Sequence, residues 1–305
     1  MSVFDRSYRT YEGELKGRLF RIWSIARSTF RVQFSGKRMI FLLIFCNLPV
    51  LAFTLMLIFM AIFIPFGSMG GLFGDLFGSL DLALYLIIIT SFNSGSIFMP
   101  IVFIAALNSG SIANDKKNNS LALYMSKPID RIDYTIGKAI SVLMVNSFVT
   151  YIPWFIFMVA FSLLSGITGS QFIQTFWVYF AALGAAMVVN LFIGSIVLLF
   201  SSMSNQTILA GILTILVLFL PSVIVNSVAQ VVSVDWLNYF SISSLITSCI
   251  YIMFGKPTAS SVFGTGFTGF IGYNINGFVS LAILLGISII AFLLTVRNLN
   301  KEEIQ

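Results

Sequence analysis

The feature that most constrains this chain is a run of 96 residues, 139–234, without one charged side chain. A second uncharged run covers residues 82–114. A charge costs several kcal/mol at the centre of a bilayer, so long uncharged apolar runs are typical of membrane spans. The whole chain is 58% hydrophobic and 9% charged, which excludes an ordinary soluble domain. The sequence therefore predicts an all-α polytopic membrane protein.

The basic residues are distributed unevenly along the chain. Of the 17 Lys and Arg residues, nine precede residue 39, five lie within 116–138 and two lie after residue 296. Lys and Arg concentrate in the cytoplasmic loops of membrane proteins. We therefore expect a multi-pass protein of the cytoplasmic (plasma) membrane with both termini in the cytoplasm. The same rule accounts for the net positive charge without a nucleic-acid partner.

Six apolar stretches approach or exceed the ~20 residues that a helix needs to cross a bilayer. They cover residues 39–64, 82–107, 136–164, 172–200, 207–231 and 278–296. The segment 233–276 is rich in Ser, Gly and aromatic residues, and we predict that it dips into the outer leaflet as two short re-entrant pieces. A full crossing there would move Arg297 and Lys301 outside, against the charge rule.

These stretches divide the chain into a transmembrane domain, residues 39–296, and two cytoplasmic tails, residues 1–38 and 297–305. In the first tail, the spacing of apolar residues predicts an amphipathic helix from residue 14 onward. Its apolar stripe consists of Leu15, Leu19, Ile22, Trp23, Ala26, Phe30 and Phe34, and its basic face of Arg21, Arg27 and Arg31. A helix of this kind lies in the headgroup plane of the inner leaflet. The alternative is a simple stop-transfer flank.

The polar and charged segment 108–138 interrupts the apolar stretches. Within it, Leu121 and Tyr124 share one face of a short helix, which Asn118 or Asn119 can cap. Isolated helices of fewer than ~12–15 residues are marginal in water. We therefore expect the apolar face of this helix to pack against a partner.

The order of residues after this helix is specific. Pro128 restricts the residue before it and ends the helix, and Asp130 is placed to cap the next one. The order Ser-x-Pro-Ile-x-Arg-x-x-Tyr-x-x-Gly-Lys resembles the cytoplasmic loop of ABC-2-type transporter permeases. The matching residues are Asp115, Lys116, Ser120, Leu121, Ser126, Pro128, Ile129, Arg131, Tyr134, Gly137 and Lys138. The family usually has Glu in place of Asp115 and Gly in place of Asn119.

The resemblance implies a function for this loop. In the family it holds a coupling helix that docks on a separate ATPase subunit, and the N-terminal interface helix also touches that subunit. The candidate coupling residues are Asp115, Lys116, Ser120, Leu121, Tyr124, Pro128 and Arg131. The implied partners are two ATPase subunits, which carry ATP and Mg, and a second permease half, in a homodimer or a heterodimer. Residues 11–14, Tyr-Glu-Gly-Glu, look like the branch of the family assigned to multicopper-enzyme maturation.

Small polar side chains mark a candidate substrate path. Thr90, Asn93 and Ser94 cluster in the second span, and Asn226 lies in the fifth. Such residues often serve helix packing in membranes. The resemblance places the second and fifth spans against the partner half, where these side chains would line the path.

Several kinds of chemistry are absent from the sequence. It has no G-x-x-x-x-G-K-[ST] phosphate loop, so it does not bind ATP in that manner. It has no His, and its spans carry no buried charges for an ion relay. We expect neither enzymatic activity nor a cofactor or metal in this chain itself. Two functions remain open: the permease of an ATP-driven transporter, expected to export its substrate, or a non-transporting membrane scaffold that docks a cytoplasmic partner.

Overall fold

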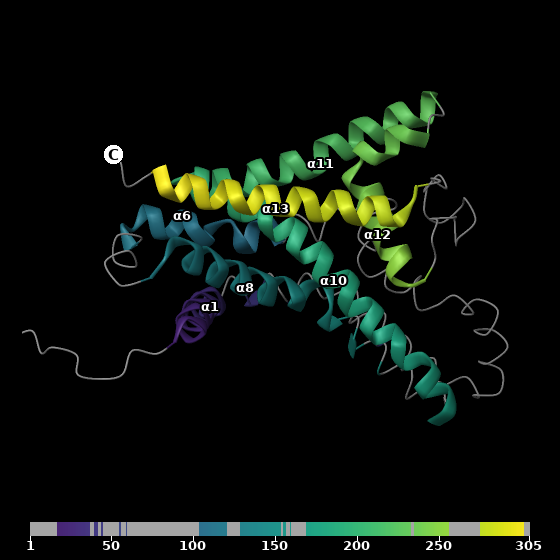
Figure 1. The fold of residues 1–305 in the computed structure, drawn as a ribbon, viewed down its shortest axis with the longest axis horizontal. Coiled ribbons are helices and arrows are strands. Elements are labelled where there is room, and N and C mark those ends of the chain that lie inside the picture. Colours follow the sequence, from purple (N-terminus) through teal and green to yellow (C-terminus); the bar gives the residue numbers. More distant parts are fainter. Residues whose placement is uncertain are drawn as a thin grey trace, which may run out of the picture.

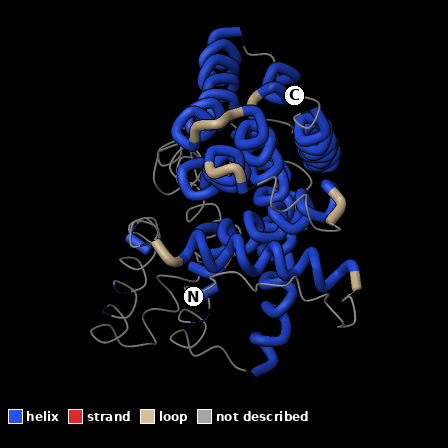
Figure 2. The backbone as a smooth tube through the Cα atoms, turned by 90° about the vertical axis from the view of Figure 1, so that its left-hand side faces the viewer, coloured by secondary structure: helices blue, strands red, loops and turns tan. Residues whose placement is uncertain are grey.

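A computed structural model describes residues 17–36, 40–41, 44, 55, 59, 104–120, 129–153, 155–156, 159, 169–232, 235–255 and 275–301. Its α-helices are α1 (Arg18–Phe34), α6 (Gly110–Lys117), α8 (Arg131–Thr150), α10 (Gly169–Met203), α11 (Thr207–Val232), α12 (Ile242–Met253) and α13 (Gly277–Lys301) (Figure 1). A 3-10 helix, η1 (Asp235–Phe240), precedes α12. No β-strand occurs within these described ranges (Figure 2).

The long helix α10 lies at the centre of the bundle and packs against α6, α8, α11, α12 and α13 (Figure 1). Ala182 and Ala185 are fully buried on it, and Phe192 fills the core about two turns further along. Small residues allow neighbouring helices to approach closely in membranes. The alanines of α10 therefore fit its central position.

Three of the described helical segments are long and apolar enough to cross a membrane: Tyr179–Met203, Thr207–Val225 and Gly277–Lys301. Their outer faces remain apolar. On α11, Ile208, Ile212 and Leu216 follow one another at helical spacing with 75%, 57% and 48% of their surfaces exposed. Soluble proteins rarely expose a continuous apolar face of this kind. The chain is therefore a helical membrane protein.

Several predicted boundaries agree with the helices. The stretch 207–231 is α11, and the stretches 172–200 and 278–296 lie within α10 and α13. The predicted break after α10 is present as the non-helical residues 204–206. The third stretch begins in α8, whereas the first two lie almost wholly outside the described residues.

The described part of the segment after α11 begins with two short helices, η1 and α12. η1 has 6 residues and α12 has 12, and Ser241 separates them and caps α12 by accepting a hydrogen bond from the Ser244 amide at 3.4 Å. A helix of 12 residues rises about 18 Å, which is too short to cross the ~30 Å hydrocarbon core. The Gly-rich part of the predicted re-entrant segment, residues 256–274, lies outside the described residues.

The amphipathic helix predicted from residue 14 onward corresponds to α1, which begins at Arg18 and whose inner face differs from the predicted stripe. Ile22, Ile25 and Ala26 are buried, and α1 packs along α8 (Figure 1). Leu19 and Trp23 are instead 82% and 49% exposed. The helix thus has one apolar face against α8 and a second apolar edge that points outward.

Candidate functional site

The candidate coupling residues that the structure describes lie at the end of the bundle where α6, the start of α8 and the end of α13 meet, on the left in Figure 1. They are Asp115, Lys116, Ser120 and Arg131. We call this end of the bundle the basic end, because it gathers Arg18, Lys116, Lys117, Arg131, Lys138, Arg297 and Lys301. Hydrogen bonds and ion pairs there connect α1, α6, α8, α10 and α13.

Asp115 of α6 is bound by two side chains of α8. The Tyr134 hydroxyl donates to Asp115 Oδ2 at 2.7 Å, and Lys138 Nζ forms an ion pair with the same oxygen at 2.7 Å. Tyr134 and Lys138 are four residues apart and therefore share one helix face. The Lys138 side chain is only 4% exposed and lies 5.4 Å from the centre of the Tyr134 ring. Asp115, a candidate coupling residue, therefore joins α6 to α8.

A second ion pair fastens α1 to α8. Arg18 Nε donates to Asp133 Oδ1 at 2.7 Å, and Nη2 of the same guanidinium is also 2.7 Å from that oxygen. The hydrogen bond to Asp133, followed by the attraction of its charge, raises the pKa of Arg18 above its ordinary value. Asp133 is completely buried, so the charge of Arg18 compensates a carboxylate that water does not reach.

Gly137 allows α1 to lie this close to α8. A Cβ placed on Gly137 would lie 2.9 Å from the Cβ of Ile25 and 3.1 Å from the carbonyl oxygen of Ile22. Such distances are shorter than ordinary side-chain contacts. The glycine before Lys138 in the sequence motif therefore has a packing role.

The remaining basic residues of the motif reach the other helices. Arg131 Nη1 donates to Asn300 Oδ1 of α13 at 2.8 Å. Lys116 Nζ donates to the carbonyl oxygen of Ser202 in α10, and Asn298 Nδ2 donates to the Ser202 hydroxyl at 3.3 Å. The basic end is thus connected from α6 through α10 to α13.

Ser201 of α10 caps α6 from another part of the chain. Its hydroxyl accepts hydrogen bonds from the amides of Ile112 and Ala113 at 3.0 and 2.9 Å and donates to the Ser109 carbonyl at 2.8 Å. The first amides of a helix have no partner inside it. Ser109, the N-cap of α6, makes no side-chain cap of its own, so Ser201 supplies this function.

The residues that follow α6 turn sharply away. Asn118 is the C-cap of α6, and Asn119 has a φ of 54°, in the left-handed region where Asn is tolerated. Ser120 is helical again, and its hydroxyl donates to the Asp115 carbonyl at 3.1 Å. The two asparagines, predicted as caps of the next helix, therefore end α6.

Other predicted site residues are only partly described. Leu121, Tyr124 and Pro128 lie outside the described residues, as do Thr90, Asn93 and Ser94. Asn226 belongs to α11, but its side chain is also outside what the structure describes. Asp130 is the N-cap of α8, as predicted, although its side chain makes no capping hydrogen bond.

Two buried polar pairs between helices were missed by the sequence reasoning. Asn108 Nδ2 donates to Asn146 Oδ1 at 2.7 Å, and Asn190 Nδ2 donates to Thr150 Oγ1 at 2.9 Å. Asn146 and Thr150 are four residues apart on α8, which is the signal that could have found them. The pairs join α8 to the helical residues before α6 and to α10.

A small polar cavity of about 130 Å³ lies between α1, α6 and α8, beside the Asp115–Lys138 pair. The hydroxyls of Thr29 and Ser111 are buried at its wall and make no hydrogen bond within the described structure. A cavity of this size has room for a few water molecules, which are the usual partners of such groups.

The contacts of this site join helices to one another. Asp115 and Asp133 each have a cation at 2.7 Å. Among the described residues, no three His, Cys, Asp or Glu side chains come together in the way that a metal site requires. The ion pairs, the Ser201 cap and the close contact at Gly137 tie α1, α6, α8, α10 and α13 into one unit.

No model of a known protein family matches this sequence, and no curated protein matches it either.

Proposed function

We propose that this chain is the membrane-spanning permease subunit of an ATP-driven ABC transporter of the ABC-2 type, working as an exporter. It would have six spans with both termini in the cytoplasm, pair with a second permease half, and bind two separate ATPase subunits. The resemblance of residues 115–138 to the family's coupling loop motivates this proposal.

One structural observation supports it most directly. Asp115, next to the loop that would dock on the ATPase, is bound by Tyr134 and Lys138 at 2.7 Å each. A displacement of that loop would therefore move α8 as well as α6. Because Ser201 binds the start of α6, the same displacement would reach α10 at the centre of the bundle.

This interpretation divides the candidate residues into two groups. Asp115, Lys116 and Arg131 bind side chains or carbonyls of this chain and would transmit force. Leu121 and Tyr124 would form the apolar anchor in a cleft of the ATPase. In protein interfaces, central apolar or aromatic anchors carry most of the affinity, whereas charges at the rim mainly set the association rate.

The decisive experiment compares two kinds of variant in the assembled complex. Leu121→Asp would bury an unpaired charge in the interface, and Tyr124→Ala would remove the anchoring ring. We expect both to insert and dimerise normally but to lose ATPase association or substrate-linked ATP turnover. The matched control is Lys117→Gln, because Lys117 is exposed at the end of α6. If Leu121→Asp and Tyr124→Ala retain full association and transport, residues 121–128 are an ordinary loop.

The same complex separates the permease from a scaffold. A permease changes the ATP turnover of its partner when a transported substrate is added, whereas a scaffold binds the partner without that response. Crosslinks between two copies through Asn93→Cys or Asn226→Cys would support a seam formed by the second and fifth spans in a homodimer. Crosslinks only through the third or fourth span would remove that path.

A further inference from the structure

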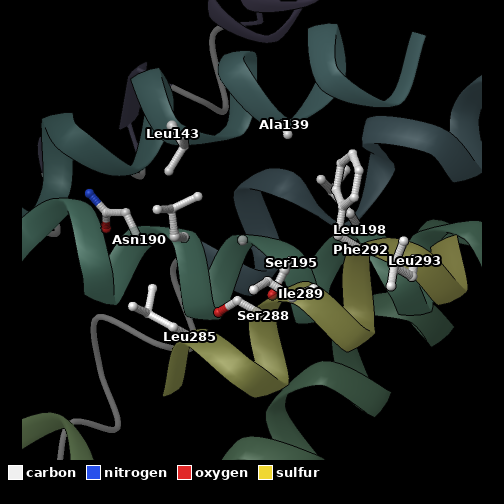
Figure 3. A pocket seen from close by; sticks show the side chains of 12 residues that line it. Ala139, Leu143, Asn190, Ser195, Leu198, Leu285, Ser288, Ile289, Phe292 and Leu293 are labelled. Atoms are coloured by element: carbon white, nitrogen blue, oxygen red, sulfur yellow. The ribbon is translucent and has the colours of Figure 1, made fainter. Parts of the chain in front are cut away.

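A groove of about 230 Å³ runs along the outside of the bundle between α8, α10 and α13 (Figure 3). Leu143 and Ala139 line it from α8, and Leu285, Ile289 and Leu293 line it from α13 (Figure 3). Ile289 and Leu293 are 60% and 61% exposed, so the groove is open toward the surroundings of the bundle.

The groove presents a hydrocarbon surface even where polar residues line it. Ser195 donates to the Phe192 carbonyl at 2.8 Å and Ser288 to the Leu284 carbonyl at 2.7 Å. Asn190 is bound to Thr150. These three side chains make their hydrogen bonds within the bundle. An occupant of the groove is therefore recognised by shape and apolar contact.

Two arginines lie beyond one end of the groove. On α8, Leu143 and Ala139 belong to a row spaced by four residues that ends at Arg131. On α13, Ile289 and Leu293 belong to a similar row that continues to Arg297. The two rows meet at the basic end, where Arg131 donates to Asn300 at 2.8 Å. Arg131 is partly exposed and Arg297 is exposed.

The distances along the helices match the dimensions of one leaflet. With a rise of 1.5 Å per residue, the groove begins about 12 Å below Arg131, at Ala139, and continues to about 18 Å below it, at Leu143. Half of the ~30 Å hydrocarbon core is about 15 Å, and each headgroup layer adds about 5–8 Å. A phosphate beside the two arginines would thus place its acyl chain in the groove.

We propose that this groove binds an anionic phospholipid, with one acyl chain between α8, α10 and α13 and the phosphate at Arg131 and Arg297. The arginines beyond one end of the groove and the leaflet-length spacing favour a lipid with an anionic headgroup as the occupant. The site is independent of the ATPase partner, so it can fail without affecting the proposed function.

Native mass spectrometry of the full chain in mild detergent tests the site, with phosphatidylglycerol and phosphatidylcholine of identical acyl chains as probes. We expect phosphatidylglycerol to be retained at lower concentration than phosphatidylcholine. A basic residue near an anionic headgroup contributes about a fivefold effect. Arg131→Gln with Arg297→Gln should therefore raise the half-saturating phosphatidylglycerol concentration about 30-fold, with little change for phosphatidylcholine.

Ala139→Phe tests the apolar part, because the new ring would occupy the groove between the helices. We expect it to weaken the binding of both lipids. The matched control is Gly286→Phe, since Gly286 lies on α13 but does not line the groove, and a Cβ there meets nothing within 4 Å. Arg27→Gln on the exposed side of α1 is the control for charge. Neither control should alter lipid retention.

A second measurement identifies the occupant directly. A fluorophore on Leu293→Cys, in a chain without its native cysteines, should be quenched more by brominated phosphatidylglycerol than by brominated phosphatidylcholine. Equal retention of the two lipids by the unmodified chain, or unchanged binding in Ala139→Phe, would overturn the proposal. Absence of quenching would do the same, because another part of the chain or a second copy then fills the groove.

Discussion

Lys138 Nζ lies 2.7 Å from Asp115 Oδ2 and joins α8 to α6. The Lys138 side chain is 4% exposed and that of Asp115 is 18% exposed. The Tyr134 hydroxyl donates to the same Asp115 oxygen. Removing one member of a buried pair is costly because it leaves an uncompensated charge.

We expect Asp115→Ala to lower the free energy of unfolding by about 3–5 kcal/mol. Unfolding by denaturant in detergent micelles measures this loss. The double variant Asp115→Asn, Lys138→Met should lose less stability than the sum of the losses in Asp115→Asn alone and Lys138→Met alone, because it removes both charges. Lys117→Met serves as the control, since Lys117 is exposed on the same helix. Additive losses would mean that the two charges do not stabilise each other.

Gly137 predicts a second measurable effect. Gly137→Ala would place a Cβ 2.9 Å from that of Ile25 and push α1 away from α8. Overpacking of this kind typically costs about 1–3 kcal/mol, and proteolysis should then release α1 more readily. Gly286→Ala is the matched control, because its Cβ meets nothing within 4 Å. There, the better helix propensity of Ala should stabilise by up to about 1 kcal/mol.

If Gly137→Ala is as stable as the unmodified chain and α1 is equally protected from proteolysis, then α1 and α8 do not approach each other closely at Gly137. A double variant with a change at Ile25 tests the same contact from the other helix. Ile25→Ala removes side-chain atoms that crowd the new Cβ, so it should cost less stability in the Gly137→Ala background than alone.

The sequence was informative about helices and less so about contacts between them. The boundaries of α11 could be predicted from its uncharged apolar stretch and from the polar break before it at residues 201–206, of which only 204–206 are non-helical. The start of α8 followed from Asp130. Asp115, however, was predicted only as a candidate coupling residue. The spacing of Tyr134 and Lys138 shows that they share a face, but only the packing of α6 on α8 shows what that face binds.

The sequence likewise did not show which residues of α1 face α8 or which buried Asn side chains pair with each other. A helical stripe of seven apolar residues predicts an amphipathic helix, but it does not specify which residues face α8. Leu19 and Trp23 therefore appeared equivalent to Ile22 and Ala26, although the former pair is exposed and the latter is buried. The Asn108–Asn146 pair likewise depends on which spans are neighbours, and no local pattern gives that.

Ser201 predicts a third effect, on the stability of α6. Ser201→Ala removes the acceptor for the Ile112 and Ala113 amides and the donor to the Ser109 carbonyl. Loss of a helix cap costs about 0.5–2 kcal/mol, and hydrogen exchange of the α6 amides should accelerate accordingly. Ser195→Ala is the control, because Ser195 is also buried on α10 and donates to the carbonyl three residues before it. Equal effects of the two variants would exclude a capping role.

The fourth prediction concerns the Asn108–Asn146 hydrogen bond. It distinguishes a contribution from the hydrogen bond itself from a contribution of side-chain volume. Asn108→Leu leaves the Asn146 amide buried without its partner. Interhelical hydrogen bonds in membranes contribute about 0.6–1.7 kcal/mol, and we expect a loss at the upper end of that range. Asn108→Leu with Asn146→Leu should be closer to neutral, because both polar groups are replaced. A double variant that is worse than both single variants together would contradict this.

The contacts at the basic end predict which segments lie on the same side of the membrane, and cysteine labelling can test this. Lys116 binds the Ser202 carbonyl and Asn298 binds the Ser202 hydroxyl, so the turn after α10 lies on the same side as the end of α13. Cysteines in place of Asn205, which is exposed in that turn, and of Asn300 must therefore react with a membrane-impermeant maleimide from one side. The charge rule predicts that this side is the cytoplasm. In intact cells, both should stay unlabelled.

The opposite set of positions completes this test. Ser79, Ser170 and Ser261 fall in the links that the six-span topology places outside, and cysteines there should react in intact cells. A cysteine at Ser7 should behave as those at Asn205 and Asn300 do. Labelling at Asn300 from outside would exclude six spans with both termini in the cytoplasm. Labelling at Asn205 and Asn300 from opposite sides would contradict the contact of α6, α10 and α13 at the basic end, in addition to the six-span topology.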